Sequence, residues 1–348
     1  MNTFHLTALI YFFSVTVIAF FSSFFITKFL ISYLNNRKIL DIPNHRSNHT
    51  IPVPRGGGIA IIISVLGYYG LTKFLNYPTI FNNYLITSIL ILSVISFIDD
   101  IKPLNIFHRF AAQFVAVAIA LYSLPNDKLL FSAHIPLIFD RLISLFALIW
   151  FINLYNFMDG IDGITGAESL HILVSVLIIF SLFWDARNSR FIGDYLVMIF
   201  AISGFLYWNW HPAKIFLGDI GSINLGFILG WILYNIALDK HIITAIIIPA
   251  YYIADSGITI LKRLLQGKKI WQAHSEHFYQ LAVKNGKTHK NVVKRIVVAN
   301  IFLLIASILS IKSNTIPIIL ALVTISTLLI SLKKSNLEVK KIEQKNLG

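Results

Sequence analysis

The chain has 348 residues, of which 56% are hydrophobic and only 13% charged, and its mean hydropathy is +0.73. Ordinary soluble domains carry about 25% charged residues, so this composition excludes that class and indicates a polytopic membrane protein. The absence of cysteine excludes disulfides and thiolate metal sites. The net charge of +13 does not indicate a nucleic-acid partner, because the basic residues flank apolar segments, as membrane orientation and contact with anionic lipids require.

Apolar segments follow one another along the chain and predict an all-α membrane fold without a separate soluble domain. The backbone must satisfy its own hydrogen bonds in lipid, so each segment is expected to be a helix. The first segment is long enough to span the bilayer and lacks the cleavage site of a signal peptide, so we expect it to be retained. The eleven predicted spans are 6–30, 58–75, 83–98, 107–124, 135–152, 168–184, 191–208, 222–237, 242–261, 292–311 and 316–332, followed by a basic tail at 333–348.

The loops between these segments alternate between the two membrane faces. Of the 29 Lys and Arg residues, 18 lie in one set of alternate loops and 7 lie on the side of the other set, counting Lys73 and Arg141 at helix ends. The remaining four lie in helix ends that face the first set. The positive-inside rule then makes the first set cytoplasmic, with the amino terminus periplasmic and the carboxyl terminus cytoplasmic. Four polar islands, at 98–100, 153–163, 216–222 and 274–277, all fall in the cytoplasmic set, so we expect them to converge on one membrane face.

A glycine-rich segment precedes the second predicted helix. Residues 52–58 read Pro-Val-Pro-Arg-Gly-Gly-Gly, and the Lys-Ser/Thr element of a Walker loop is missing. The segment is either a flexible entry to the helix or a phosphate contact through its backbone and Arg55.

Asp99 and Asp100 close the third predicted helix. Acids at a helix C-terminus are disfavoured by the helix dipole, and two adjacent carboxylates repel each other. A solvated helix end is the simpler alternative, but a neutralising cation accounts better for the pair.

The 153–163 island carries Asn153, Asn156, Asp159 and Asp162 together with glycines. One helical turn would place both acids on one face. A turn between two membrane helices also uses Asn, Asp and Gly, but an eleven-residue run this polar is more than a turn needs.

The last two islands have weaker signals when taken alone. Asp219 opens the eighth predicted helix, where it is either a cap or part of an anion site, and Phe216 either stacks on a base or packs. His274 and His277 flank Glu276 in the longest cytoplasmic loop, a pattern that suits a metal or a pyrophosphate but has little specificity.

Together these motifs resemble the polyprenyl-phosphate N-acetylhexosamine-1-phosphate transferase superfamily. The most specific parts are Asn-Phe-Met-Asp-Gly-Ile-Asp-Gly at 156–163 and Phe-Leu-Gly-Asp-Ile-Gly-Ser at 216–222. The resemblance implies that undecaprenyl phosphate attacks the β-phosphorus of a UDP-N-acetyl sugar, with UMP as the second product. It also implies a bacterial inner-membrane enzyme that requires Mg²⁺, with Mn²⁺ as an alternative.

The resemblance implies three groups of site residues. The residues expected at the metal are Asp219, Asp99, Asp100 and Asp159. The residues expected to bind substrate are Arg55, Asn153, Asn156, Asp159, Asp162 and Phe216, with Phe216 stacking on uracil. The residues expected in catalysis are Asp99, Asp100, His274 and His277.

Two features indicate the branch that initiates O-antigen synthesis within lipopolysaccharide biosynthesis. The loop at 274–277 has two histidines where three or more are usual, and the 52–56 segment is similar to that of this branch. The donor stays open among UDP-N-acetylglucosamine, UDP-N-acetylfucosamine and UDP-N-acetylquinovosamine. Peptidoglycan or teichoic-acid carrier synthesis is the alternative within the superfamily, and an ion-coupled transporter is the alternative outside it. The oligomeric state also stays open, with a homodimer as one assembly.

Overall fold

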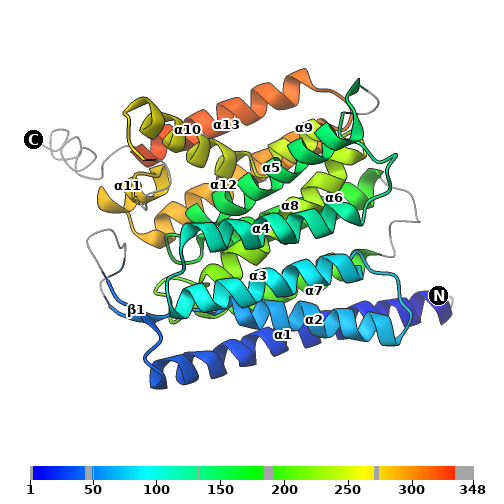
Figure 1. Ribbon diagram of the computed structural model, residues 1–348, viewed down its shortest axis with the longest axis horizontal. Coiled ribbons are helices and arrows are strands. Elements are labelled where there is room, and N and C mark those ends of the chain that lie inside the picture. The colour runs from blue at the N-terminus through cyan, green and yellow to red at the C-terminus, as the bar shows by residue number, and fades with distance from the viewer. Residues whose placement is uncertain are drawn as a thin grey trace, which may run out of the picture.

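The computed structural model describes residues 3–43, 49, 51–131, 134–183, 191–269 and 274–333, and almost all of this part is helical (Figure 1). The helices are α1 Thr3–Asn36, α2 Gly58–Phe74, α3 Asn83–Ile101, α4 Ile106–Tyr122, α5 Leu137–Phe157, α6 Ile164–Phe183, α7 Ile192–Asn209, α8 Asp219–Leu238, α9 Ile242–Ile247, α10 Ala250–Leu265, α11 Phe278–Lys284, α12 His289–Leu309 and α13 Thr315–Lys333. Two short strands, β1 Leu40–Asp41 and β2 Val53–Pro54, pair antiparallel.

Eight of the described helices are long and apolar enough to cross a membrane, and α2 and α4 are shorter apolar helices. Large apolar side chains such as Phe146 and Leu322 are exposed on the outside of the bundle, where lipid would cover them. The prediction of a mostly helical, multi-pass membrane protein is confirmed. Eleven spans and the orientation of the termini stay predictions, and the basic tail beyond residue 333 lies outside the described residues.

The long helices run roughly parallel, and α8 lies in the middle of the bundle (Figure 1). Every residue of α8 except Asn235 is buried, and α8 packs against α2, α3, α5, α6 and α9. A helix that is apolar all round belongs in the interior, and this one has Asp219 as its first residue. The start of α1 lies at one end of the bundle, whereas β1 and α11 lie at the opposite end (Figure 1).

Two predicted segments need correction. The span predicted at 242–261 is broken into α9 and α10, because Pro249 lacks the N–H that a continuous helix needs. The span predicted at 135–152 continues to Phe157 in α5, so the first residues of the 153–163 island are helical rather than part of a loop.

Helices α2 and α8 approach each other closely at two glycines. A Cβ added to Gly58 would lie 2.2 Å from Gly221 Cα, far inside van der Waals contact. The backbone N–H of Gly58 donates to the carbonyl of Leu217 at 2.8 Å, so this contact also holds the chain immediately before α8. The glycines therefore set the position of the segment that carries Arg55.

We expect Gly58→Ala to destabilise the protein by about 1–3 kcal/mol, because the two backbones must separate to accept one methyl group. The thermal midpoint in detergent measures this. The matched control is Gly67→Ala in the same helix, where an added Cβ meets nothing within 4 Å and alanine favours the helix. Equal midpoints for the two variants would contradict the close contact.

Candidate active site

A short bridge between distant segments positions Arg55 and Phe216. The N–H of Phe216 donates to the carbonyl of Pro54 at 2.8 Å, and the N–H groups of Gly56 and Gly57 donate to the carbonyl of Phe216 at 3.2 and 2.9 Å. Gly218 follows with φ +76°, and an added Cβ there would meet an oxygen of Asp100 at 2.6 Å. The glycines of both segments thus allow Arg55 to reach the start of α8.

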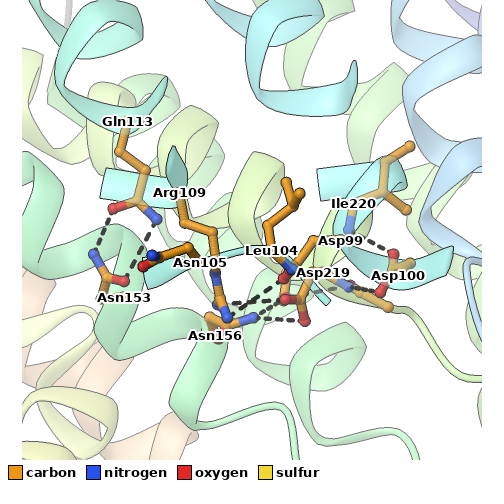
Figure 2. Close-up of polar contacts among 12 residues, drawn as sticks. Asp99, Asp100, Leu104, Asn105, Arg109, Gln113, Asn153, Asn156, Asp219 and Ile220 are labelled. Atoms are coloured by element: carbon orange, nitrogen blue, oxygen red, sulfur yellow. Dashed lines mark hydrogen bonds and ion pairs between the residues drawn. The ribbon is translucent and has the colours of Figure 1, made fainter. Parts of the chain in front are cut away.

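Three acids and two arginines meet at this point. Figure 2 shows the three acids together with Arg109. Arg55 contacts Asp100 through Nε at 2.8 Å and Asp219 through Nη2 at 2.5 Å. Arg109, from the first turn of α4, lies 3.3 Å from Asp99 and 3.3 Å from Asp219. Asp219 is therefore the acid that both guanidinium groups share.

Asp100 and Asp99 also hold backbone groups. Asp100 accepts the N–H groups of Asp219 at 2.8 Å and Ile220 at 3.0 Å, which satisfies donors that the start of α8 leaves free. One oxygen of Asp99 accepts the N–H of Leu104 at 2.6 Å. Both oxygens of Asp100 are thus engaged by the backbone, whereas those of Asp219 contact the side chains of Arg55, Arg109 and Asn156.

The two asparagines of the 153–163 island have different hydrogen-bond partners. Asn156 donates to Asp219 Oδ1 at 3.2 Å and to the hydroxyl of Ser222 at 2.8 Å, so it belongs to the acid–arginine cluster. Asn153 lies one turn earlier on α5 and donates to Gln113 Oε1 at 2.7 Å (Figure 2). It ties α5 to α4 instead of contacting the cluster.

Asp159 and Asp162 lie between α5 and α6 in a non-helical segment, so the expectation that one helical turn aligns them is wrong. Burial raises the pKa of Asp159 to about 7. Among the described residues, no Lys, Arg or His nitrogen forms an ion pair with this carboxyl group. The positive charge of Arg55 opposes this rise in the pKa of Asp159, but burial outweighs it.

Asp162 is held by two histidines that come from other segments. His211 Nδ1 lies 2.6 Å from Asp162 Oδ2, His289 Nδ1 lies 3.2 Å from Oδ1, and the N–H of Ala213 donates at 3.2 Å. Burial favours the neutral acid, but the hydrogen bonds from His289 and His211 outweigh it and lower the pKa of Asp162. Ligand atoms of the three side chains lie within 4.8 Å of one another, yet the 2.6 Å separation is that of a hydrogen bond.

The two histidines of the 274–277 island have different surroundings. His277 is buried and lies 3.2 Å from Asp255, away from the acids of the cluster. His274 is half-buried, and burial together with His277 and Arg263 lowers its pKa to about 4. His274 is thus neutral at physiological pH and offers a donor and an acceptor rather than a charge.

A cavity of about 370 Å³ opens where these segments meet. The predicted site residues that line it are Arg55, Asn156, Asp159, Asp162, Phe216, Asp219 and His274. Asn153 and His277 do not line it, and Asp99 lines a small neighbouring cavity together with Arg109 and Gln113. The polar islands that the loop pattern groups together therefore meet at the level of their side chains.

Several residues of the site are not among those predicted from the sequence. Arg109 had a visible signal, since a charge inside an otherwise apolar helix needs a partner. His211 and His289 lie at helix ends among ordinary loop residues, and only the fold brings them to Asp162.

The donor set at the cavity suits a hard divalent cation. Three carboxylates in the cluster face two guanidinium groups, and Asp159 lines the same cavity as Asp219. Carboxylate oxygens with space for water and phosphate oxygens are what Mg²⁺ prefers. Asp219 and Asp159 are the best placed to hold it, because both line the cavity, whereas Asp100 does not.

Comparison with known proteins gives consistent matches. Residues 83–237 match the model of glycosyl transferase family 4. The chain is 28% identical over 283 residues to the probable undecaprenyl-phosphate N-acetylglucosaminyl 1-phosphate transferase of Bacillus subtilis. The aligned region covers 78% of this chain and 76% of that relative. It is 31% identical over 254 residues to the phospho-N-acetylmuramoyl-pentapeptide-transferase of Staphylococcus saprophyticus, and the aligned region covers 65% of this chain and 75% of that relative.

A third relative is a mycobacterial protein. The chain is 26% identical over 289 residues to the decaprenyl-phosphate N-acetylglucosaminephosphotransferase of Mycobacterium tuberculosis, covering 71% of this chain and 70% of the relative. The stretch that matches the family model includes α3 to α8 with their acids. The chain belongs to glycosyl transferase family 4, within the polyprenyl-phosphate N-acetylhexosamine-1-phosphate transferase superfamily.

Proposed function

We propose that this protein transfers an N-acetylhexosamine 1-phosphate from a UDP-sugar to undecaprenyl phosphate. The products are undecaprenyl-diphospho-sugar and UMP, which makes the protein a phosphotransferase for substituted phosphate groups. The observation that carries the proposal is the shared position of Arg55, Asp159 and Asp219 on one cavity at the end of the bundle. The names of the relatives support the same reaction.

In the proposed reaction an oxygen of the acceptor phosphate attacks the β-phosphorus of the donor. A new P–O bond forms, the bond from the β-phosphorus to the bridging oxygen breaks, and its electron pair leaves with UMP. Arg55 lies at the cavity with a guanidinium group that suits phosphate oxygens, and Arg109 contacts the second oxygen of Asp219. Because the acceptor is already anionic, positioning and charge neutralisation are the main tasks of the side chains.

Asp219 and Asp159 would hold Mg²⁺, which neutralises the diphosphate charge when bound. Phe216 lines the cavity beside the acids and presents a ring on which uracil would stack. His274 is neutral and lines the same cavity, where it suits hydrogen bonding to the sugar or the pyrophosphate. Asp162, Asn156 and His277 then position this machinery through their contacts with neighbouring segments.

We propose that the cavity faces the cytoplasm from the bacterial inner membrane. The 18 to 7 division of basic residues supports this orientation. A UDP-sugar arrives from the cytoplasm and a polyprenyl phosphate from the bilayer, so a site at the end of the bundle can receive both. A transporter site would be expected near the bilayer midplane instead.

We assign the pathway to O-antigen or related envelope polysaccharide synthesis on the motifs at residues 52–56 and 274–277. Peptidoglycan carrier synthesis is the second candidate, and the named activity of the Staphylococcus saprophyticus relative favours it. The donor distinguishes the two, because a muramoyl-pentapeptide is far larger than one N-acetylhexosamine.

The purified protein in detergent is expected to release UMP with undecaprenyl phosphate, Mg²⁺ and one member of a panel of UDP-N-acetylhexosamines. The panel includes UDP-N-acetylmuramoyl-pentapeptide. EDTA should stop the release, and excess Mg²⁺ should restore it, with Mn²⁺ tested in parallel. Release that persists in EDTA would contradict the metal assignment, and no release from folded protein with any donor would contradict the reaction.

A further inference from the structure

A buried acid on α10 contacts the 274–280 segment. Asp255 is fully buried and accepts the backbone N–H groups of Phe278 at 3.0 Å and Tyr279 at 3.2 Å. The same carboxyl group lies 3.2 Å from His277 Nδ1 and accepts the hydroxyl of Tyr251 at 3.2 Å. One side chain therefore engages three successive residues of the segment.

The contacts continue from Asp255 to the cavity. The ring of His277 stacks on that of His274, with centroids 4.9 Å apart and planes 25° apart, and His274 lines the cavity. The His277 ring also stacks on Tyr279, at 5.8 Å and 22°. The imidazole that Asp255 orients is thus packed directly against a side chain that lines the substrate cavity.

Tyr279 links the same segment to the acids between α5 and α6. Its hydroxyl donates to the carbonyl of Phe157 at 2.9 Å, and a Cβ added to Gly160 would lie 2.2 Å from that hydroxyl. Gly160 is the residue after Asp159. The 274–280 segment and the 157–160 segment are therefore in contact through Tyr279, and both line the cavity.

A second residue of α10 holds the start of the same segment. Arg263 Nη1 lies 2.6 Å from Glu276 Oε1, and its Nη2 donates to the carbonyl of Lys269 at 3.0 Å. Arg263 follows Asp255 by eight residues, a spacing that places both on one side of a helix. With Glu276 bound to Arg263 and Ser275 bound to Lys284, His274 is the member of 274–277 that lines the cavity.

We propose that Asp255 is a positioning residue of the transferase site: it fixes the 274–280 segment so that His274 and the loop carrying Asp159 keep their places on the cavity. The inference rests on the proposed function for its kinetic consequence, but its structural part can be measured separately. Asp255 lies outside all four polar islands of the sequence and does not line the cavity.

The kinetic test compares Asp255→Asn with a control that removes an equivalent buried acid on another helix. Asp255→Asn places an amide NH₂ among N–H donors, so the segment loses its fixed position. The matched control is Asp194→Asn in the first turn of α7, because Asp194 is also fully buried and accepts the hydroxyl of Thr79 and the N–H of Ile80.

Both variants are expected to lower the thermal midpoint. Only Asp255→Asn should also lower kcat/KM for the UDP-sugar, by about 10–100-fold, because small displacements of positioned groups reduce the rate by this much. The KM for undecaprenyl phosphate should change much less. Equal midpoint losses with an unchanged kcat/KM in both variants would overturn the proposal.

A second measurement does not depend on turnover. The chain has no cysteine, so Ser275→Cys introduces a single thiol at a buried position. Its labelling by a membrane-impermeant maleimide should be slow, should become about tenfold faster with Asp255→Asn, and should be unchanged with Asp194→Asn, because local opening controls access. An equal labelling rate in all three backgrounds would overturn the proposal even if no donor is ever found.

If Asp255→Asn does not fold, His277→Phe tests the same contact. Phenylalanine keeps a ring against His274 but cannot bond Asp255. We expect an intermediate loss of kcat/KM for the donor and faster labelling at position 275. Kinetics and labelling equal to those of the parent protein would overturn the proposal.

The two proposals fail in distinguishable ways. A protein that is inactive with every donor, but whose Ser275→Cys thiol stays protected until Asp255 or His277 is replaced, would contradict only the proposed reaction. An active protein whose kcat/KM for the donor is unchanged by Asp255→Asn would contradict only the positioning role.

Discussion

Asp219→Asn is expected to lower UMP release by about 10³-fold or more. Asp219 is the acid that Arg55, Arg109 and Asn156 all contact, and it lines the cavity from the first residue of α8. The amide keeps the shape but removes the charge that holds both arginines and, by our proposal, Mg²⁺. The measurement is lipid-dependent UMP release at saturating donor.

The control for this prediction is Asp239→Asn at the other end of α8. Asp239 is exposed and pairs with Lys128 at 3.3 Å, a surface contact worth little. Its loss should leave turnover unchanged. If Asp219→Asn retained more than about a tenth of the activity, the acid would not be at the centre of the chemistry.

Arg55→Met is expected to destabilise the protein and to abolish measurable turnover. The substitution leaves Asp100, whose side chain is 1% exposed, and Asp219 without their shared cation. Removing one partner of a buried ion pair is strongly unfavourable, but the Arg55 side chain is 35% exposed, so we expect a loss of about 1–3 kcal/mol. The thermal midpoint and UMP release measure the two effects separately.

Arg55→Lys should separate charge from geometry. Lysine keeps the cation but cannot contact two carboxylates through a planar fork, so stability should recover in part while turnover stays low. Arg37→Met is the control, because Arg37 is exposed and lies over the ring of Tyr33 at 5.6 Å. A midpoint for Arg55→Met equal to that of Arg37→Met would mean that the acids are neutralised by other groups.

The islands that carry Asp99, Asp100 and Asp219 show which site residues can be predicted from local sequence patterns. Asp99, Asp100 and Asp219 stand out because carboxylates beside apolar helices are expensive unless they have partners. Their partners are only partly visible in the sequence: Arg55 is a candidate from its glycine-rich segment, and Arg109 is a charge in an otherwise apolar helix, but neither pattern names the acid that each arginine contacts. Arg55 and Asp219 are 164 residues apart, so no local pattern relates them.

The 153–163 island shows the limits of boundary prediction. Its polarity suggests a loop after residue 152, but α5 continues to Phe157, with Asn153 and Asn156 bonded to partners on α4 and α8. Tertiary hydrogen bonds can thus keep polar residues in a membrane helix that composition alone would end earlier.

The amino-acid sequence by itself determined the helical membrane class, the approximate helix positions and the polar motifs near the helix ends. These follow from hydropathy, length and charge, which are local properties that the bilayer converts directly into structure. Only the tertiary structure decided that His277 pairs with Asp255, that Asp162 is held by histidines from other segments, and that His274 lines the cavity. Those contacts depend on how separate helices pack, and packing is a property of the whole bundle that no single segment contains.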